Sequence, residues 1–141
     1  MEYQWEYRRW CEMATEDREL KDELLAMDEA QIEDAFYRNL AFGTGGLRGL
    51  IGAGTNRMNV YTVAKASQGL ANAIKRKMAA GKIAISYDSR IKSELFAQVA
   101  AGVFAANGLT AYIYPRLMPT PCLSFAVRQL GCDAGVMITA S

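Results

Sequence analysis

The chain has 141 residues, of which 51% are apolar and 22% are charged, and this length is typical of one ordinary domain. A chain of this size buries roughly two thirds of its unfolded surface, so it needs no disulfide or metal to complete a core. The composition therefore argues against disorder and against a miniprotein. Sixteen Lys and Arg residues against fifteen Asp and Glu residues give a net charge of +1, which does not favour nucleic acid as a partner.

No stretch approaches the ~20 continuous apolar residues that span a bilayer, and the first residues lack a basic-then-apolar signal segment. We therefore expect a cytoplasmic protein without membrane contact. The cysteines Cys11, Cys122 and Cys132 form no Cys-x-x-Cys pair and are expected to be reduced, partly buried thiols. The chain has no histidine, which removes the commonest general base and the commonest zinc ligand.

Helical periodicity runs through the first forty residues. The apolar residues at this spacing are Leu20, Leu24, Met27, Ile32, Phe36 and Leu40. Asp28, followed three residues later by Gln31, is typical of an N-cap with a capping box. We expect this cap to divide the segment into two short helices.

From about Thr62 onward, helices and strands alternate. The sequence predicts three helices in this part of the chain. The first covers 62–77, the second runs from a cap at Ser93 to a stop at 107–108, and the third runs from an N-cap at Thr120 to Gly131. It also predicts strands over 82–87, 109–114 and 134–139, of which the last is expected to be buried. This alternation predicts an α/β fold: a three-layer α/β/α domain with a small, mostly parallel (mixed) sheet, preceded by N-terminal helices. The predicted domains are a helical extension over 1–41 and an α/β domain over 42–141.

Polar clusters follow the predicted strands, where ligands bind in open α/β sheets. The stretch 42–57 holds six of the twelve glycines, with Thr44 and Arg48 among them. Its backbone N–H groups and the Arg48 guanidinium suit an anion such as phosphate. The alternative is a flexible loop with a solvated arginine, because the stretch fits neither G-x-G-x-x-G nor a Gly-Lys-Ser/Thr motif.

Two further clusters lie after later strands. Asp88 can pair with Arg90 or with Arg48 across the strand ends, or can simply cap a turn. Ser141 follows the last strand and would project its hydroxyl into the same crevice, although a terminal serine more often belongs to a frayed end.

The order in which the motifs occur favours a functional interpretation of these clusters. The motifs are Gly43-Thr44-Gly45-Gly46-Leu47-Arg48-Gly49, Tyr87-Asp88-Ser89-Arg90, Pro119-Thr120-Pro121 and Gly135-Val136-Met137-Ile138-Thr139-Ala140-Ser141. From about Leu40 to the last residue, this series resembles the first domain of the α-D-phosphohexomutases, which include phosphoglucomutase and phosphomannomutase. The helical leader, with 42–46 and 52–59, is similar to a branch whose members act as phosphoglucomutases or phosphopentomutases.

The resemblance implies catalytic roles for Ser141 and Arg48. Ser141 stands where the family's serine carries a phosphoryl group, donates it to a sugar monophosphate and recovers it from a bisphosphate intermediate. Arg48 stands where the family's arginine stabilises the phosphoryl group in transfer. Thr44, Gly45 and Gly46 would bind phosphate with Arg48, and Asp88 and Arg90 would support the site.

The resemblance also implies a magnesium ion, which Ser141 would ligate through its phosphate. The family's Asp-Gly-Asp-x-Asp loop and its later domains are missing from this sequence. We therefore expect a truncated gene product or an expressed fragment that is inactive or nearly so by itself and binds no magnesium. Surfaces for the missing domains, with Tyr112, Tyr114, Leu117 and Met118, would favour self-association.

The expected function is thus the first domain of a phosphoglucomutase-type mutase that converts glucose 1-phosphate into glucose 6-phosphate. The alternatives are a phosphopentomutase or phosphomannomutase domain, and a phosphate-binding module without turnover that uses Gly45, Gly46 and Arg48. A nucleotide-binding domain is the weakest alternative, because the glycine spacing fails.

Overall fold

The structure is a computed structural model in which the chain forms two compact units, divided between Thr62 and Val63. We call them the helical unit and the sheet unit and treat each by itself. The division falls within the first turn of α4 (Val60–Lys75). The residues that the structure describes are 3–14, 17–40, 42–43, 46–47, 49–77, 81–88, 92–114 and 120–138.

Three short helices begin the helical unit: α1 (Tyr3–Met13), α2 (Arg18–Leu25) and α3 (Glu29–Phe36). The predicted capping box is confirmed, because the Asp28 side chain accepts the Gln31 N–H and the Gln31 side chain accepts the Asp28 N–H. The prediction of two helices is wrong. A second cap, Asp17, accepts the Leu20 N–H and starts α2 as a separate helix.

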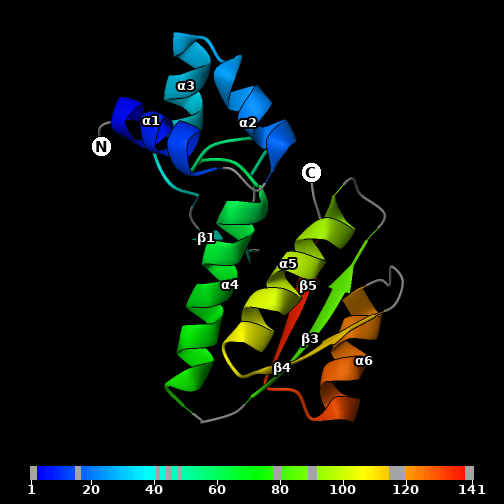
Figure 1. The fold of residues 1–141 in the computed structure, drawn as a ribbon. Coiled ribbons are helices and arrows are strands. Elements are labelled where there is room, and N and C mark those ends of the chain that lie inside the picture. Colours follow the sequence, from blue (N-terminus) through cyan, green and yellow to red (C-terminus); the bar gives the residue numbers. More distant parts are fainter. Residues whose placement is uncertain are drawn as a thin grey trace. The chain divides into compact units, whose positions relative to one another are not determined.

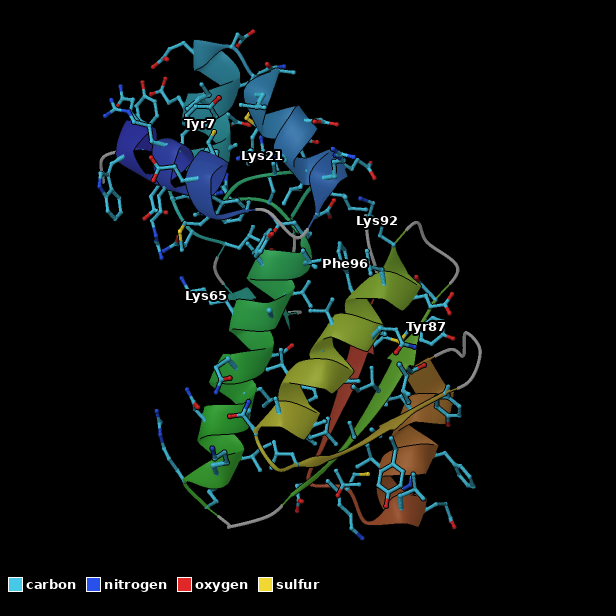
Figure 2. The ribbon with its side chains drawn as sticks, viewed as in Figure 1. Tyr7, Lys21, Lys65, Tyr87, Lys92 and Phe96 are labelled. Carbon is cyan, nitrogen blue, oxygen red and sulfur yellow. The ribbon has the colours of Figure 1, made fainter. Side chains whose placement is uncertain are left out.

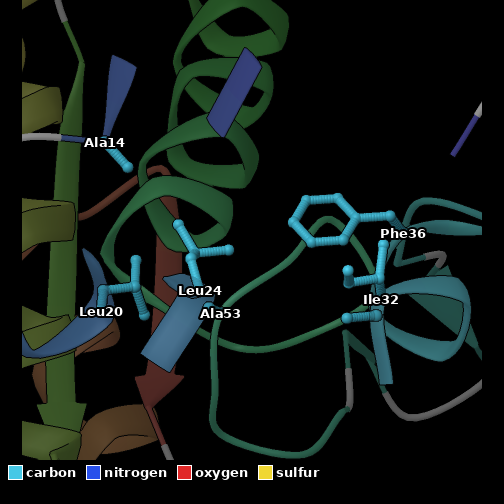
Figure 3. Packing of buried hydrophobic residues seen from close by; sticks show 7 residues of the cluster. Ala14, Leu20, Leu24, Ile32, Phe36 and Ala53 are labelled. Carbon is cyan, nitrogen blue, oxygen red and sulfur yellow. The ribbon is translucent and has the colours of Figure 1, made fainter. Parts of the chain in front are cut away.

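The core of the helical unit centres on Phe36, which is fully buried (Figure 3). Tyr7 and Trp10 of α1 meet its ring edge-to-face, with ring centroids 5.8 and 5.5 Å away. Trp10 also packs edge-to-face on Tyr61. Aromatic pairs of this kind contribute about 1 kcal/mol each beyond the area that they bury, so the contacts of Tyr7 and Trp10 with Phe36 help to hold α1 against α3.

The sheet unit contains three parallel strands, β3 (Lys82–Tyr87), β4 (Thr110–Ile113) and β5 (Ala134–Ile138), in the order β4-β3-β5. The connecting helices are α5 (Ser93–Ala106) and α6 (Thr120–Leu130). The chain moves one way along the sheet through α5 and back through α6, and right-handed crossovers then place the two helices on opposite faces (Figure 1). The α/β/α fold is confirmed, with only parallel pairs in the described part of this sheet.

Burial of the strands follows their position in the sheet. β3 is central and is buried at every residue after Lys82, as expected for a parallel strand covered on both faces. β5 lies at an edge, and Ile138 is its only buried residue. The prediction of a buried last strand is therefore wrong for most of its length, because β5 has a strand neighbour on one side only within the described residues.

The helix ends agree closely with the sequence. Gly108 follows α5 with a φ of +79° and Gly131 follows α6 with a φ of +65°, the left-handed conformation that glycine adopts most readily. α6 begins at Thr120, one residue before the predicted start, and α4 is shifted by two residues toward the N-terminus. The cap at Thr120 rests on a side chain outside the described set.

We predict that Phe36→Ala lowers the free energy of unfolding by about 4 kcal/mol, because it removes the ring on which Tyr7 and Trp10 pack. Tyr37→Ala, at a neighbouring residue that is 45% exposed, is the matched control and should change it by less than about 1 kcal/mol. Urea unfolding of both variants checks this. Equal effects would place the core elsewhere.

Candidate functional site

The ends of β3 and β5 meet at the carboxyl edge of the sheet. Tyr87 pairs with Ile138 in the strand register, and the Asp88 N–H donates to the Ile138 carbonyl oxygen at 3.3 Å. The carboxyl ends of β3 and β5 therefore lie side by side. This is the edge at which ligands bind in open α/β sheets.

Asp88 is held at this edge by a second bond. The Ser93 hydroxyl donates to its carboxylate at 2.8 Å, and Ser93 is fully buried. The prediction that Ser93 caps α5 is wrong. Lys92 takes the cap position with no side-chain capping bond, so the Ser93 hydroxyl is used for Asp88 instead. Figure 2 labels Tyr87 and Lys92, the residues directly before Asp88 and directly before Ser93.

The other predicted site residues are only partly covered by the structure. Thr44, Gly45, Arg48, Arg90 and Ser141 lie outside the described residues. The expected meeting of Arg48 with Ser141, and the pairing of Asp88 with an arginine, therefore stay predictions.

The glycine-rich stretch begins with a pair of short strands, which the sequence did not predict. β1 (Phe42–Gly43) and β2 (Gly46–Leu47) pair antiparallel, with Phe42 opposite Leu47 and Gly43 opposite Gly46. The predicted phosphate-binding residue Gly46 is thus part of a strand. Only two residues separate the strands, the length of a tight hairpin connection.

The segment 49–59 directly after Arg48 is fastened to the helices of its own unit. The Leu40 N–H donates to the Thr55 carbonyl at 3.0 Å, and the Asn56 N–H donates to the Ala35 carbonyl at 2.9 Å. Glu23 of α2 accepts the Ala53 N–H. These bonds fix the backbone on both sides of the stretch that carries Arg48.

An ion pair adds less to this fastening than the backbone bonds do. Arg57 pairs with Asp34 of α3. Because the Asp34 side chain is 65% exposed, the pair contributes at most about 1 kcal/mol. Gly54 provides a stronger restriction, since its φ is +125° and a Cβ there would lie 2.5 Å from the Ala35 carbonyl oxygen. Only glycine fits this close approach of two backbones.

Asn59 is the centre of the segment. Its amide group donates to the carbonyls of Gly52 at 2.8 Å and Gly54 at 3.0 Å. Its side-chain oxygen accepts the N–H groups of Tyr61 and Thr62 at 3.0 Å each, which caps the start of α4. One side chain, only 3% exposed, thus satisfies four backbone groups and joins the glycine loop to the helix.

Sequence reasoning missed Asn59, Glu23 and the Asp88–Ser93 bond. Asn59 had a usable signal, because Asn directly before an apolar helical pattern is a typical N-cap. Glu23 had none, since it lies 30 residues from Ala53 in the chain. The Asp88–Ser93 bond had none either, because the serine is equally suited to capping.

The cysteines behave as predicted where the structure describes them. Cys11 and Cys132 are free and half-buried, whereas the Cys122 side chain lies outside the described set. Burial raises the pKa of the Cys132 thiol, and the nearby Lys82 charge opposes this only in part. Cys132 is therefore a protonated, weakly nucleophilic thiol at neutral pH.

The magnesium ion that the resemblance implies stays a prediction, because Ser141, its implied ligand, lies outside the described residues. Among the residues that the structure describes, no three Cys, Asp or Glu side chains lie together where they could hold a metal ion. The same residues include no helix that is both long and apolar enough to cross a membrane.

The expected self-association surface stays a prediction. Tyr112 and Tyr114 are half-buried, and residues 117–118 lie outside the described ranges.

Fold and site together define an α/β/α domain in which Asp88 lies at the carboxyl edge of a parallel sheet, bonded to Ser93 and to β5. Residues 39–141 match the family model described as phosphoglucomutase/phosphomannomutase, alpha/beta/alpha domain I. The chain therefore belongs to the phosphoglucomutase/phosphomannomutase family, as the resemblance predicted.

Curated relatives agree with this assignment. The chain is 42% identical over 130 residues to a probable phosphoribomutase of Schizosaccharomyces pombe, covering 90% of this chain and 22% of that protein. It is 40% identical over 132 residues to a phosphoglucomutase of Staphylococcus saprophyticus and 39% over 132 residues to one of Staphylococcus aureus, covering 94% of this chain and 24% of each relative. The chain thus spans about a quarter of the length of the relatives that it matches. No solved structure matches it.

The family similarity and the packing divide the chain at different places. The family match begins at residue 39, near the predicted domain boundary after residue 41. The contacts divide the chain at Thr62 instead, because segment 49–59 packs with α2 and α3. The predicted boundary stays a prediction, and the helical leader is a packing partner of the family segment.

We predict that Asn59→Ala lowers the free energy of unfolding by about 3 kcal/mol, because it removes a helix cap and leaves buried carbonyls unsatisfied. Asn59→Ser keeps a capping oxygen but has a single donor, so it should lose about half as much.

The matched control is Asn72→Ala at an exposed residue of α4, where the amide oxygen accepts a surface hydrogen bond from Gln68. Loss of this solvated bond is offset by the higher helix propensity of alanine, so the free energy of unfolding should change by less than about 0.5 kcal/mol. Urea unfolding measures all three variants. An Asn59→Ala midpoint equal to that of Asn72→Ala would contradict the central role of Asn59.

Proposed function

We propose that this chain is the domain of a sugar-phosphate mutase that carries the phosphoryl group on Ser141. The observation that carries the proposal is the bond from the Asp88 N–H to the Ile138 carbonyl at 3.3 Å. It sets Asp88 beside Ile138, the last residue of β5, and Ser141 follows three residues further along the chain. The order of motifs and the family membership support the same assignment.

The proposed reaction transfers a phosphoryl group between an ester oxygen of the sugar phosphate and the Ser141 hydroxyl. A new bond forms between Ser141 Oγ and phosphorus while the bond between phosphorus and the sugar oxygen breaks. The serine proton ends on the sugar oxygen, and the reverse step returns the phosphoryl group to the other end of a sugar monophosphate. Arg48 would stabilise the charge on the equatorial oxygens, because such transfers depend on positioning and electrostatics.

The proposed substrates are glucose 1-phosphate and glucose 6-phosphate, with a glucose bisphosphate as the intermediate. Two of the relatives above carry the name phosphoglucomutase, which favours glucose. A pentose phosphate is the second candidate, because the 42% identical relative is named a probable phosphoribomutase. The cytoplasmic location expected from the sequence belongs to the same proposal.

The chain by itself is proposed to turn over sugar phosphates slowly or not at all, because it matches about a quarter of the length of its relatives. Phosphoryl uptake by Ser141 is therefore the sharper assay. It needs one transfer only, and mass spectrometry detects its product.

We predict that the chain, incubated with glucose 1,6-bisphosphate and magnesium chloride, gains the mass of one phosphoryl group at Ser141. Ser141→Ala should gain none, because the accepting hydroxyl is gone. Ser67→Ala, at a buried serine of α4, should gain it like the wild type. Uptake that persists in Ser141→Ala would overturn the assignment, and sugar-phosphate binding without uptake in the wild type would favour a binding module.

We predict that Arg48→Ala slows this uptake by more than about tenfold, the scale of losing one group that stabilises a developing negative charge. Arg48→Lys keeps the charge but loses the planar fork that matches phosphate oxygens, so an intermediate rate is expected. Arg9→Ala, at an exposed arginine of α1, is the control. Rapid-quench mass spectrometry measures the rates, and a wild-type rate for Arg48→Ala would make Arg48 a solvated surface residue.

A further inference from the structure

Ser93 is a buried serine with no assigned role in the proposed phosphoryl transfer. It is the first residue of α5 and is 0% exposed. Its hydroxyl donates to the Asp88 carboxylate at 2.8 Å. A hydrogen bond from a hydroxyl to a carboxylate is among the stronger ones in proteins, and burial on the donor side shields it from water.

The backbone at Lys92 places Ser93 where its hydroxyl bonds Asp88 and where it does not cap α5. Lys92 has a φ of +66°, and it is the one non-glycine residue with a positive φ in the described part of the chain. α5 begins with no side-chain capping bond, although a serine one position earlier would cap it well. Unfavourable backbone geometry of this kind is concentrated at functional sites. The turn thus delivers the serine to Asp88 rather than to the helix end.

Asp88 connects Ser93 to β5 through two hydrogen bonds. Its carboxylate is bonded to α5 through Ser93, and its N–H is bonded to the Ile138 carbonyl of β5. The three residues therefore connect the start of α5 with the last residue of the strand that leads to Ser141. Without the Ser93 donor, Asp88 keeps its backbone bond to Ile138 but loses one contact that orients its side chain.

We infer that Ser93 is a positioning residue for phosphoryl transfer at Ser141 and that it acts through Asp88. The inference rests on the proposed function. Because Ser93 lies beneath Asp88 in the interior, it orients the carboxylate and the adjoining edge of the sheet without touching the substrate. Loss of such orientation slows the transfer step and leaves ground-state binding unchanged.

The test measures single-turnover phosphoryl uptake by the 141-residue chain at a series of glucose 1,6-bisphosphate concentrations. Ser93→Ala should lower the maximal rate by about tenfold, with the half-saturating concentration within about twofold of the wild-type value. Ser93→Thr keeps the hydroxyl and should restore most of the rate. Ser67→Ala, which removes another buried hydroxyl of the same unit, should leave both quantities unchanged.

A double variant separates positioning from general stability. Since Ser93 acts through Asp88, Asp88→Ala and Asp88→Ala/Ser93→Ala should have the same rate. Independent, additive losses would overturn the inference, as would a wild-type rate for Ser93→Ala. If Ser93→Ala does not fold, Asp88→Ala tests the link from its half-buried side, and a wild-type rate there overturns it equally. A wild-type chain that takes up no phosphoryl group would overturn the proposed function instead.

Discussion

Parallel pairing of β3 with β5 is the constraint on which the rest of the sheet unit depends. It runs in register from Ile83 opposite Ala134 to Tyr87 opposite Ile138, so both strands end at the same level. A shift by one residue would turn every side chain of one strand to the other face. Residues of β3 pack against α6 on one face, where Ala84 meets Leu123, and such a shift would break that contact. The register therefore fixes both the core and the edge from which Asp88 projects.

The helical unit meets a different requirement, which is to order a chain segment rich in glycine. Glycine loses more conformational entropy on folding than other residues, and a stretch with six glycines over 42–57 has few side chains with which to recover it. The structure recovers it through polar contacts from outside the stretch. Glu23 accepts an N–H from the segment, and Asn59 binds two of its carbonyls. The helices that precede the family segment thus order the backbone next to Arg48.

Local patterns predicted most of the fold, and long-range polar contacts account for what they missed. The β3 bounds, the Asp28 capping box and the glycine stops after α5 and α6 follow from residues within a few positions of one another. The start of α2 was missed because the residues before Asp28 were interpreted as one helix and the Asp17 cap was not recognised. At the site, Asp88 was placed at the sheet edge by the strand pattern alone. Its partner Ser93 was misassigned, because a serine before a helical pattern predicts a cap and only the left-handed turn at Lys92 redirects it.

The contacts that hold the glycine segment and those that hold Asp88 differ in how much rearrangement of the chain they permit. Asn59 and Gly54 hold the glycine segment by bonds and close contacts between backbones, which leave little room for an alternative arrangement. Asp88 accepts a side-chain bond from Ser93 and donates a backbone bond to Ile138, and it is only half-buried. Breaking the first kind of contact leaves buried carbonyls unpaired and removes stability, whereas breaking the second exposes a carboxylate that water can solvate. Substitutions at Asn59 should therefore appear first in unfolding, and substitutions at Ser93 should appear first in the rate of transfer.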